Sequence, residues 1–221
     1  MDWNVTVHSS DRLLTLPNVI SGLEVQSNTC NDANLTDFNL SRFLNMRDIL
    51  IGSKSLKNVA ELSLSNMPKL HSFISEFDSL PKSNSFIATN NPMLENVEIG
   101  DKSFQSSSTF SLGGLSSLTA LYVGSNCFQG DDNDSQSQPQ PSTNSTSSSL
   151  QFMLNGFNQL SDVVLSSDSF THFKTFEVSG RRCNVILLLL FLLIMKLLKI
   201  NITNTNRIIT RLLPVGHSGN W

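Results

Sequence analysis

Residues 118–128 read LTALYVGSNCF, and the apolar positions of this stretch recur through the chain at a fixed interval. Leu118 aligns with Leu94, Leu70 and Met46 at a constant 24-residue spacing. Two further columns keep the same interval: Ile49, Phe73, Val97 and Leu121, then Leu56, Leu80, Phe104 and Phe128. A fixed period of about 20 to 50 residues indicates a solenoid, because one unit cannot bury its apolar face alone and must stack on its neighbours.

A second set of apolar columns lies in the upstream half of each unit. Its members are Phe38, Leu62, Phe86 and Phe110, then Leu40, Leu64, Ala88 and Leu112, then Phe43, Met67, Asn91 and Leu115. Further along, Phe152 to Phe170 repeats the spacing of Phe110 to Phe128, so a fifth unit follows in phase. We predict one solenoid over residues 13–180, mostly short parallel strands with few helices, preceded by a polar lead-in at residues 1–12. Its first unit, residues 13–37, matches only partly, through Leu14, Leu16, Val19 and Val25.

The fourth and fifth units are separated by residues 129–149, a stretch that is rich in serine, glutamine and proline and has almost no apolar side chain. Such a composition cannot offset the entropy of ordering, and it predicts a disordered loop that leaves the solenoid at one turn and rejoins it at the next. Asp131, Asp132 and Asp134 raise the hypothesis of a calcium site. The loop lacks EF-hand spacing, so a solvated acidic loop is the preferred interpretation.

The composition changes abruptly at residues 181–221, where Val185 to Met195 forms an unbroken apolar run that extends to Ile200 past Lys196 and Lys199. The run predicts a hydrophobic C-terminal helix. Eleven residues rise only about 16 Å as a helix, whereas a bilayer core is about 30 Å thick, so residues 185–200 reach spanning length only with their flanking lysines at the interface. A helix that is apolar on every side favours membrane insertion over burial on a solenoid end. A reading-frame artefact is a third explanation.

The location of the protein follows from this segment alone, and the membrane is favoured over the cytoplasm. The first residues, from Met1 to His8, contain no basic region and no continuous apolar stretch, so no signal peptide is predicted. If residues 185–200 span a membrane, the positive charge that follows them places the tail in the cytoplasm.

Charge and motifs exclude several classes of function. The net charge of −3, with 15% charged residues, argues against a nucleic-acid partner. Cys30, Cys127 and Cys183 are widely spaced and are interpreted as buried thiols. The histidines lie far apart in the sequence, and no known catalytic or metal-binding motif is present. We therefore predict no catalytic residues, no metal site and no cofactor, which means a protein that is not an enzyme.

The segment from Leu118 to Phe128 resembles the LxxLxLxxNxL pattern of leucine-rich repeats, and the fuller unit is similar to the BspA-like family of protists and bacteria. The resemblance implies a leucine-rich-repeat solenoid with strands on its concave side and a role in binding. Two features depart from the family pattern: Ser75 replaces an apolar residue, and only one unit has the characteristic Asn, in the column Lys54, Asp78, Lys102, Asn126 and Asp168. We expect irregular stacking there.

The candidate binding residues follow from the alternation of side chains along a strand. If Leu121 and Val123 point inward, the position between them faces solvent. Across the units this position reads Leu50, Ile74, Glu98, Tyr122 and Val164. Four of the five are apolar, which predicts an exposed strip that binds a protein or glycan ligand. The alternative is a membrane-tethered structural or surface-coat protein without a specific ligand, whose copies associate through the same strip.

Overall fold

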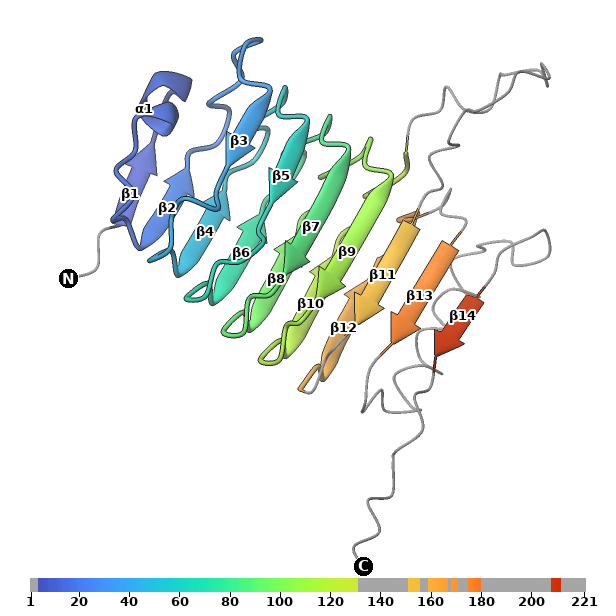
Figure 1. The fold of residues 1–221 in the computed structure, drawn as a ribbon. Coiled ribbons are helices and arrows are strands. Elements are labelled where there is room, and N and C mark those ends of the chain that lie inside the picture. Colours follow the sequence, from blue (N-terminus) through green and yellow to red (C-terminus); the bar gives the residue numbers. More distant parts are fainter. Residues whose placement is uncertain are drawn as a thin grey trace, which may run out of the picture.

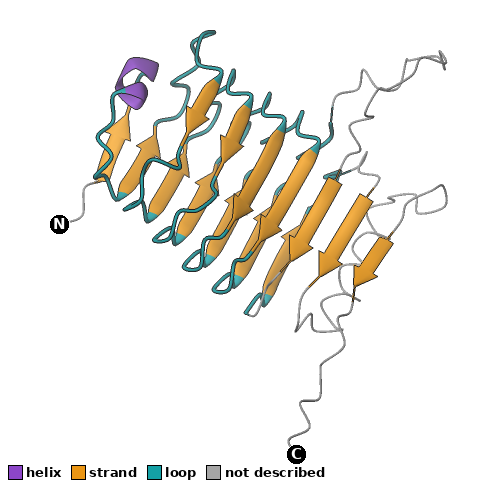
Figure 2. Ribbon diagram, in the orientation of Figure 1, coloured by secondary structure: helices purple, strands orange, loops and turns teal. Residues whose placement is uncertain are grey.

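The described part of the chain forms a β-solenoid in which parallel strands stack side by side and almost no helix is present (Figures 1 and 2). The computed structural model describes residues 4–130, 151–155, 159–166, 168–170, 175–179 and 208–211. Side chains are described for residues 4–130, 159–166 and 168–170. The one helix among these residues, α1 (Ser10–Leu14), lies at the N-terminal end of the stack (Figure 2).

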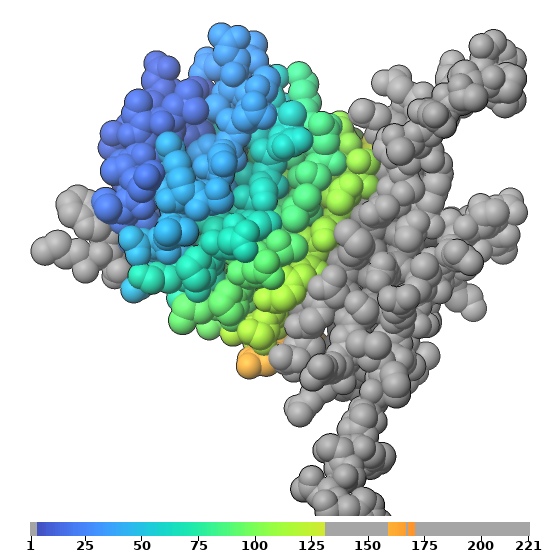
Figure 3. Space-filling model, in the orientation of Figure 1, coloured from blue at the N-terminus to red at the C-terminus, as the bar shows by residue number. Residues whose placement is uncertain are grey.

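From β2 to β13 the strands alternate between two sheets, so each of these coils contributes one strand to each sheet, and all paired strands are parallel. In the described residues, sheet A contains β1 (Asn4–Val7), β2 (Gly22–Val25), β4 (Asp48–Ile51), β6 (Ser72–Ser75), β8 (Asn96–Ile99), β10 (Ala120–Val123) and β12 (Asp162–Leu165). Sheet B contains β3 (Asp37–Asn39), β5 (Glu61–Ser63), β7 (Ser85–Thr89), β9 (Thr109–Gly113), β11 (Gln151–Asn155), β13 (Thr175–Ser179) and β14 (Ile208–Arg211). The coils pack against one another in sequence order (Figure 3).

The core lies between the two sheets and is built from the inward side of each alternating strand. In β8, Val97 and Ile99 are buried while Glu98 is exposed, and in β7, Phe86 and Ala88 are buried. Because a strand has a side-chain period of two, every in-register coil adds its buried residues to the same columns. The 24-residue period of the sequence is therefore the length of one coil.

Aromatic rings form the centre of this core. Phe104 stacks on Phe128 with ring centroids 5.6 Å apart, and Phe128 stacks on Phe170 at 4.9 Å. From sheet B, Phe110 meets Phe128 edge-on at 5.0 Å. Aromatic pairs in such geometries contribute about 0.5–1.5 kcal/mol each beyond the area they bury, so they hold successive coils together.

From β2 onward, the corner after each sheet A strand has a repeated backbone conformation. It has two positions with positive φ, one in the column of Lys54, Asp78, Lys102, Asn126 and Asp168 and one two residues later, for example Lys102 (φ 61) and Phe104 (φ 53). The Lys102 amide donates to the Ser125 carbonyl of the next coil at 2.8 Å, and Asp78 donates to Asp101 in the same way. These are backbone contacts, so the corner forms whether the residue is Lys, Asp or Asn.

A ladder of small buried side chains runs between the two positive-φ columns. The Ser103 hydroxyl donates to the Glu76 carbonyl at 2.6 Å and accepts the Ser79 amide at 3.2 Å. Cys127 occupies the same position one coil later, and its thiol donates to the Gly100 carbonyl at 3.2 Å. The ladder satisfies backbone groups that the tight corner removes from water.

The stacking is regular, and the irregularity expected from the departing residues is not observed. Ser75 pairs in register with Ile51 on one side and Ile99 on the other. The neighbouring apolar columns set the register. The cost of having Ser75 here is local: its buried hydroxyl has no hydrogen-bond partner.

Two sheets are present where the sequence predicts one sheet of strands on a concave side. The upstream half-unit also alternates with a period of two, as in Phe86 and Ala88, and it forms the strands of sheet B. This alternation could have identified the second sheet. The coarser prediction of a repeat solenoid with parallel strands and few helices is confirmed.

The solenoid also extends beyond both predicted boundaries. β1 pairs with β2 and Val7 is fully buried, so β1 lies within sheet A, upstream of the solenoid boundary expected at residue 13. In α1 the helical period buries Leu13 and leaves Leu14 53% exposed, which removes Leu14 from the expected core. At the other end, β14 pairs with β13 and continues sheet B past residue 180.

The array resumes in register after the insertion, as predicted. Ala120 pairs with Asp162 and Thr109 with Gln151. The strand register of both sheets therefore continues after the insertion with the same offset in sequence. Gln129 and Gly130 still donate to the Gln105 carbonyl of the preceding coil, at 2.8 and 3.1 Å. The rest of the predicted disordered loop lies outside the described residues, and so does the hydrophobic segment 185–200.

Candidate functional site

The five candidate binding residues share one column on the outer face of sheet A. Register pairs join Leu50 to Ile74, Ile74 to Glu98, Glu98 to Tyr122 and Tyr122 to Val164. Tyr122 is 39% exposed and Val164 47%, whereas Leu50 and Ile74 are partly exposed. We refer to Leu50, Ile74, Tyr122 and Val164 as the apolar strip. Its side chains face outward because their neighbours in each strand fill the core.

The column continues toward the N-terminus with two polar residues. Thr6 and Glu24 lie in register with Leu50, and the Thr6 hydroxyl donates to a Glu24 carboxylate oxygen at 3.2 Å. Both were missed in the sequence because the first unit departs from the regular period. The alternation in Val5-Thr6-Val7 and Leu23-Glu24-Val25 could have identified them.

A second outward column runs beside the first, two residues upstream in each strand. It consists of Asn4, Gly22, Asp48, Ser72, Asn96, Ala120 and Asp162. We define the A face as these two columns together. A shallow hollow of about 280 Å³ lies over its N-terminal half and is lined by Leu50 and Ile74 together with Glu24 and Asp48. Apolar and acidic side chains therefore border the same depression.

The A face carries one sign of charge. Its described positions include four carboxylates, Glu24, Asp48, Glu98 and Asp162, and contain no lysine or arginine. The register neighbours of Glu24 and of Glu98 are all uncharged. Asp162 accepts a hydrogen bond from the neighbouring Ser161 hydroxyl at 2.9 Å. The columns of this face therefore hold negative charge that no cation within the same columns balances.

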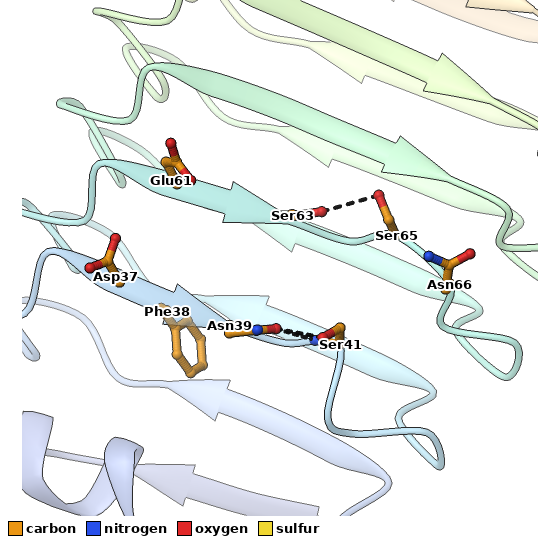
Figure 4. Close-up of a pocket in the computed structure, with 8 residues that line it drawn as sticks. All are labelled: Asp37, Phe38, Asn39, Ser41, Glu61, Ser63, Ser65 and Asn66. Carbon is orange, nitrogen blue, oxygen red and sulfur yellow. Dashed lines mark hydrogen bonds between the residues drawn. The ribbon is translucent and has the colours of Figure 1, made fainter.

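The outer face of sheet B has a different chemistry. Its outward columns begin with Asp37, Glu61, Ser85 and Thr109, and with Asn39, Ser63, Ile87 and Ser111. We refer to these two columns as the B face. A hollow of about 420 Å³ over β3 and β5 is lined mainly by hydroxyl, amide and carboxylate groups (Figure 4). Many of these groups pair locally, as Ser63 does with Ser65 at 3.1 Å.

The two described cysteines are free, buried thiols, as the sequence predicts. Burial raises the pKa of Cys127 to about 12, and it raises the pKa of Cys30 as well. A thiol with so high a pKa is almost entirely protonated at neutral pH and is a poor nucleophile. Cys127 is therefore explained by the buried ladder, where it replaces a serine.

The described histidines make local contacts. His71 Nδ1 lies 2.7 Å from the Lys69 carbonyl, and His8 Nδ1 lies 2.5 Å from the Gln26 amide oxygen. Across the described part of the chain, no three His, Cys, Asp or Glu side chains are grouped so that they could hold a metal ion. In the same residues, no helix is long and apolar enough to cross a bilayer.

The five predicted residues thus lie on adjacent strands of the A face and in register. Comparison of the chain with family models, with curated proteins and with solved structures finds no match, so neither a family nor a function comes from a relative.

Proposed function

We propose that this chain is a non-enzymatic binding module that recognises a protein ligand on the A face. The observation that carries the proposal is the apolar strip itself. It places four apolar side chains in one outward column, with Glu98 between Ile74 and Tyr122, and Leu50 and Ile74 line a shallow hollow. Exposed contiguous apolar surface rimmed by polar groups is typical of interaction sites.

The fold does not require these side chains to be apolar. Sheet B has the same parallel, in-register strands, and its outward positions include the polar residues Asn39 and Ser63. Tyr122 also contributes a large, rigid contact surface with a polar hydroxyl, a combination that is enriched in binding hot spots. Selection for contact with a partner explains an apolar outward column better than folding does.

We further propose that the repeats are of the leucine-rich type and similar to the BspA-like family. The support is the sequence pattern from Leu118 to Phe128, together with a parallel strand in each coil at the expected segment. The corner differs from what that pattern implies. Its Lys and Asp positions stack through backbone hydrogen bonds, and the neighbouring serine column adds side-chain hydrogen bonds.

A direct test compares two isoleucines on opposite faces. Peptides selected from a random display library on the full chain are measured against Ile74→Ser and Tyr122→Ser on the A face and against Ile87→Ser on the B face. Ile74 and Ile87 are both partly exposed and both lie in interior strands of their sheets. We expect the A-face variants to lose binding by tenfold or more, as hot-spot truncations of about 1.4 kcal/mol or more do, and Ile87→Ser to keep it.

Equal affinities for all three variants would contradict the site assignment. Circular dichroism and thermal melting of each variant establish that a loss of binding is not a loss of fold. The structural alternative, self-association through the same strip, predicts a different result. In sedimentation velocity the wild-type chain would then form oligomers that Ile74→Ser dissolves, and library selection would yield no specific peptide.

A further inference from the structure

We infer that the ligand of the A face is a basic amphipathic helix, with Lys or Arg opposite Glu24 and Glu98 and with apolar side chains on Leu50 and Ile74. This inference rests on the proposed function, that the A face binds a protein. It adds the chemistry and the shape of the bound segment.

The charge of the face selects a cationic partner. Glu24, Asp48, Glu98 and Asp162 all lie on the A face, and its described columns contain no lysine or arginine. A surface whose charged groups are all carboxylates is negative, so it attracts a cationic segment and repels nucleic acids and anionic lipid surfaces. The hollow that contains Glu24 and Asp48 also contains Leu50 and Ile74, so the same ligand must present apolar groups.

The order of residues along the column gives the pattern of the ligand. Glu24, Leu50, Ile74 and Glu98 lie on four successive strands in register. Neighbouring strands are about 4.8 Å apart, which separates Glu24 from Glu98 by about 14 Å. A complementary segment therefore presents basic, apolar, apolar and basic side chains, in that order, along a similar length.

A helix fits this spacing with one side chain for each coil. Successive turns of an α-helix are about 5.4 Å apart, so three turns cover about 16 Å, and the flexible stems of Lys or Arg absorb the difference of about 2 Å. An extended strand repeats its facing side chains every 6.6–6.8 Å or so and would place about one apolar residue over the two coils of Leu50 and Ile74. Helices are also the usual cover of parallel sheets.

The experiment uses a synthetic helical peptide of Ala and Gln that carries Lys, Leu, Leu and Lys on successive turns of one face. Two matched peptides replace both Lys with Gln or with Glu, and a fourth alternates Lys and Leu as a strand would. Binding to the full chain is measured by fluorescence anisotropy at low and at physiological salt. The protein variants are Glu24→Gln/Glu98→Gln and, as a control with two carboxylates on the B face, Asp37→Asn/Glu61→Gln.

We expect the Lys helix to bind more tightly than the Gln helix by about fivefold to tenfold at low salt, with the Glu helix weakest. Glu24→Gln/Glu98→Gln should abolish the difference between the Lys and Gln helices, and added salt should reduce it. Asp37→Asn/Glu61→Gln should change nothing. Tighter binding of the alternating strand peptide would overturn the helix, and the absence of binding by the Lys helix would overturn the inference as a whole.

The failure of this inference differs from a failure of the proposed function. If the Lys and Gln helices bind equally and both lose binding to Ile74→Ser, the charge pattern is wrong and the binding site stands. If binding of the Lys helix is unchanged by Ile74→Ser and Tyr122→Ser, the peptide does not use the apolar strip and both proposals fail.

Discussion

The two outer faces of this solenoid are built by the same rule and carry different chemistry. Sheets A and B have parallel in-register strands whose inward residues meet in one aromatic core. Outward, the A face combines an apolar strip with four carboxylates, and the B face is dominated by Ser, Thr, Asn and acidic side chains. The comparison shows that the repeat constrains inward positions strongly and outward positions weakly, so the outward residues are where function can be read.

The largest effect is expected from a substitution in the core that the two sheets share. Phe104 is fully buried and contacts Phe73, Phe86 and Phe128. Phe104→Ala should lower the free energy of unfolding by about 3–5 kcal/mol, measured by urea denaturation, and should reduce hydrogen-exchange protection in both sheets. The control is Phe77→Ala, because Phe77 is an exposed ring and its loss should cost less than about 1 kcal/mol. Loss of protection in one sheet only would mean that the faces are supported separately.

A smaller effect is expected at the corner after sheet B. The buried Asn91 amide donates to the Leu64 carbonyl and accepts the Met67 amide at 2.8 Å. Asn91→Ala leaves both backbone groups buried without a partner, and we expect a loss of about 2–4 kcal/mol in chemical denaturation. Asn45→Ala removes an exposed amide that binds only Lys69, and it should change stability by less than about 0.5 kcal/mol. Similar losses in the two variants would refute this role of Asn91.

The corner after sheet A contains a titratable group that tests the buried ladder. The pKa of Cys127 is about 12 in the fold and 9.0 without burial, so folding favours the neutral thiol. This contribution to stability is complete below pH 9 and is lost as the pH rises from 9 toward 12. At pH 10.5 the loss amounts to about 2 kcal/mol. Cys127→Ser should flatten this part of the curve of melting temperature against pH. An unchanged slope in the variant would show that Cys127 does not titrate in this range.

The inward side of sheet A contains one residue that should be improved by substitution. Ser75 lies in register between Ile51 and Ile99, and its hydroxyl is buried and has no hydrogen-bond partner. Ser75→Ala should stabilise the chain by about 1 kcal/mol in urea denaturation, because it removes an unsatisfied polar group. Ser79→Ala should instead destabilise, since the Ser79 hydroxyl donates to the Glu76 carbonyl at 3.0 Å. Destabilisation by both changes would contradict this distinction.

The smallest effect is expected from neutralising one acidic residue on each face. On the B face, Asp37 and Glu61 are register partners, so two carboxylates lie side by side. Glu61→Gln should raise the melting temperature slightly, equivalent to about 0.3 kcal/mol, by removing like-charge repulsion. Glu98→Gln on the A face should give no such gain, because its register neighbours Ile74 and Tyr122 are uncharged. The gain should disappear at high salt, and a gain that persists there would rule out a charge effect.

The sequence predicts the inward half of this molecule well. Columns such as Leu94 and Leu118, or Val97 and Leu121, are identified by their constant interval and are fully buried in the structure. The same alternation places Tyr122 and Val164 outward, and both side chains are exposed in the structure. That they bind a ligand stays a prediction.

The first coil and the second sheet were harder to predict, for separate reasons. α1 and a longer interval between Leu23 and Ile49 take the first coil out of phase with the others, so Thr6 and Glu24 were not assigned to the outward column. The strands of sheet B lie outside the leucine-rich pattern, which predicts a strand in only one segment of each unit.

The period and the alternation of apolar residues are local properties of the chain, and they were sufficient for the coil length, the parallel stacking and the buried columns. Which outward residues become neighbours depended on the register of strands that lie a full coil or more apart in the sequence. Only the folded array brings Glu24, Leu50, Ile74 and Glu98 into one line, because hydrogen bonds between coils, rather than contacts along the chain, set their order and spacing.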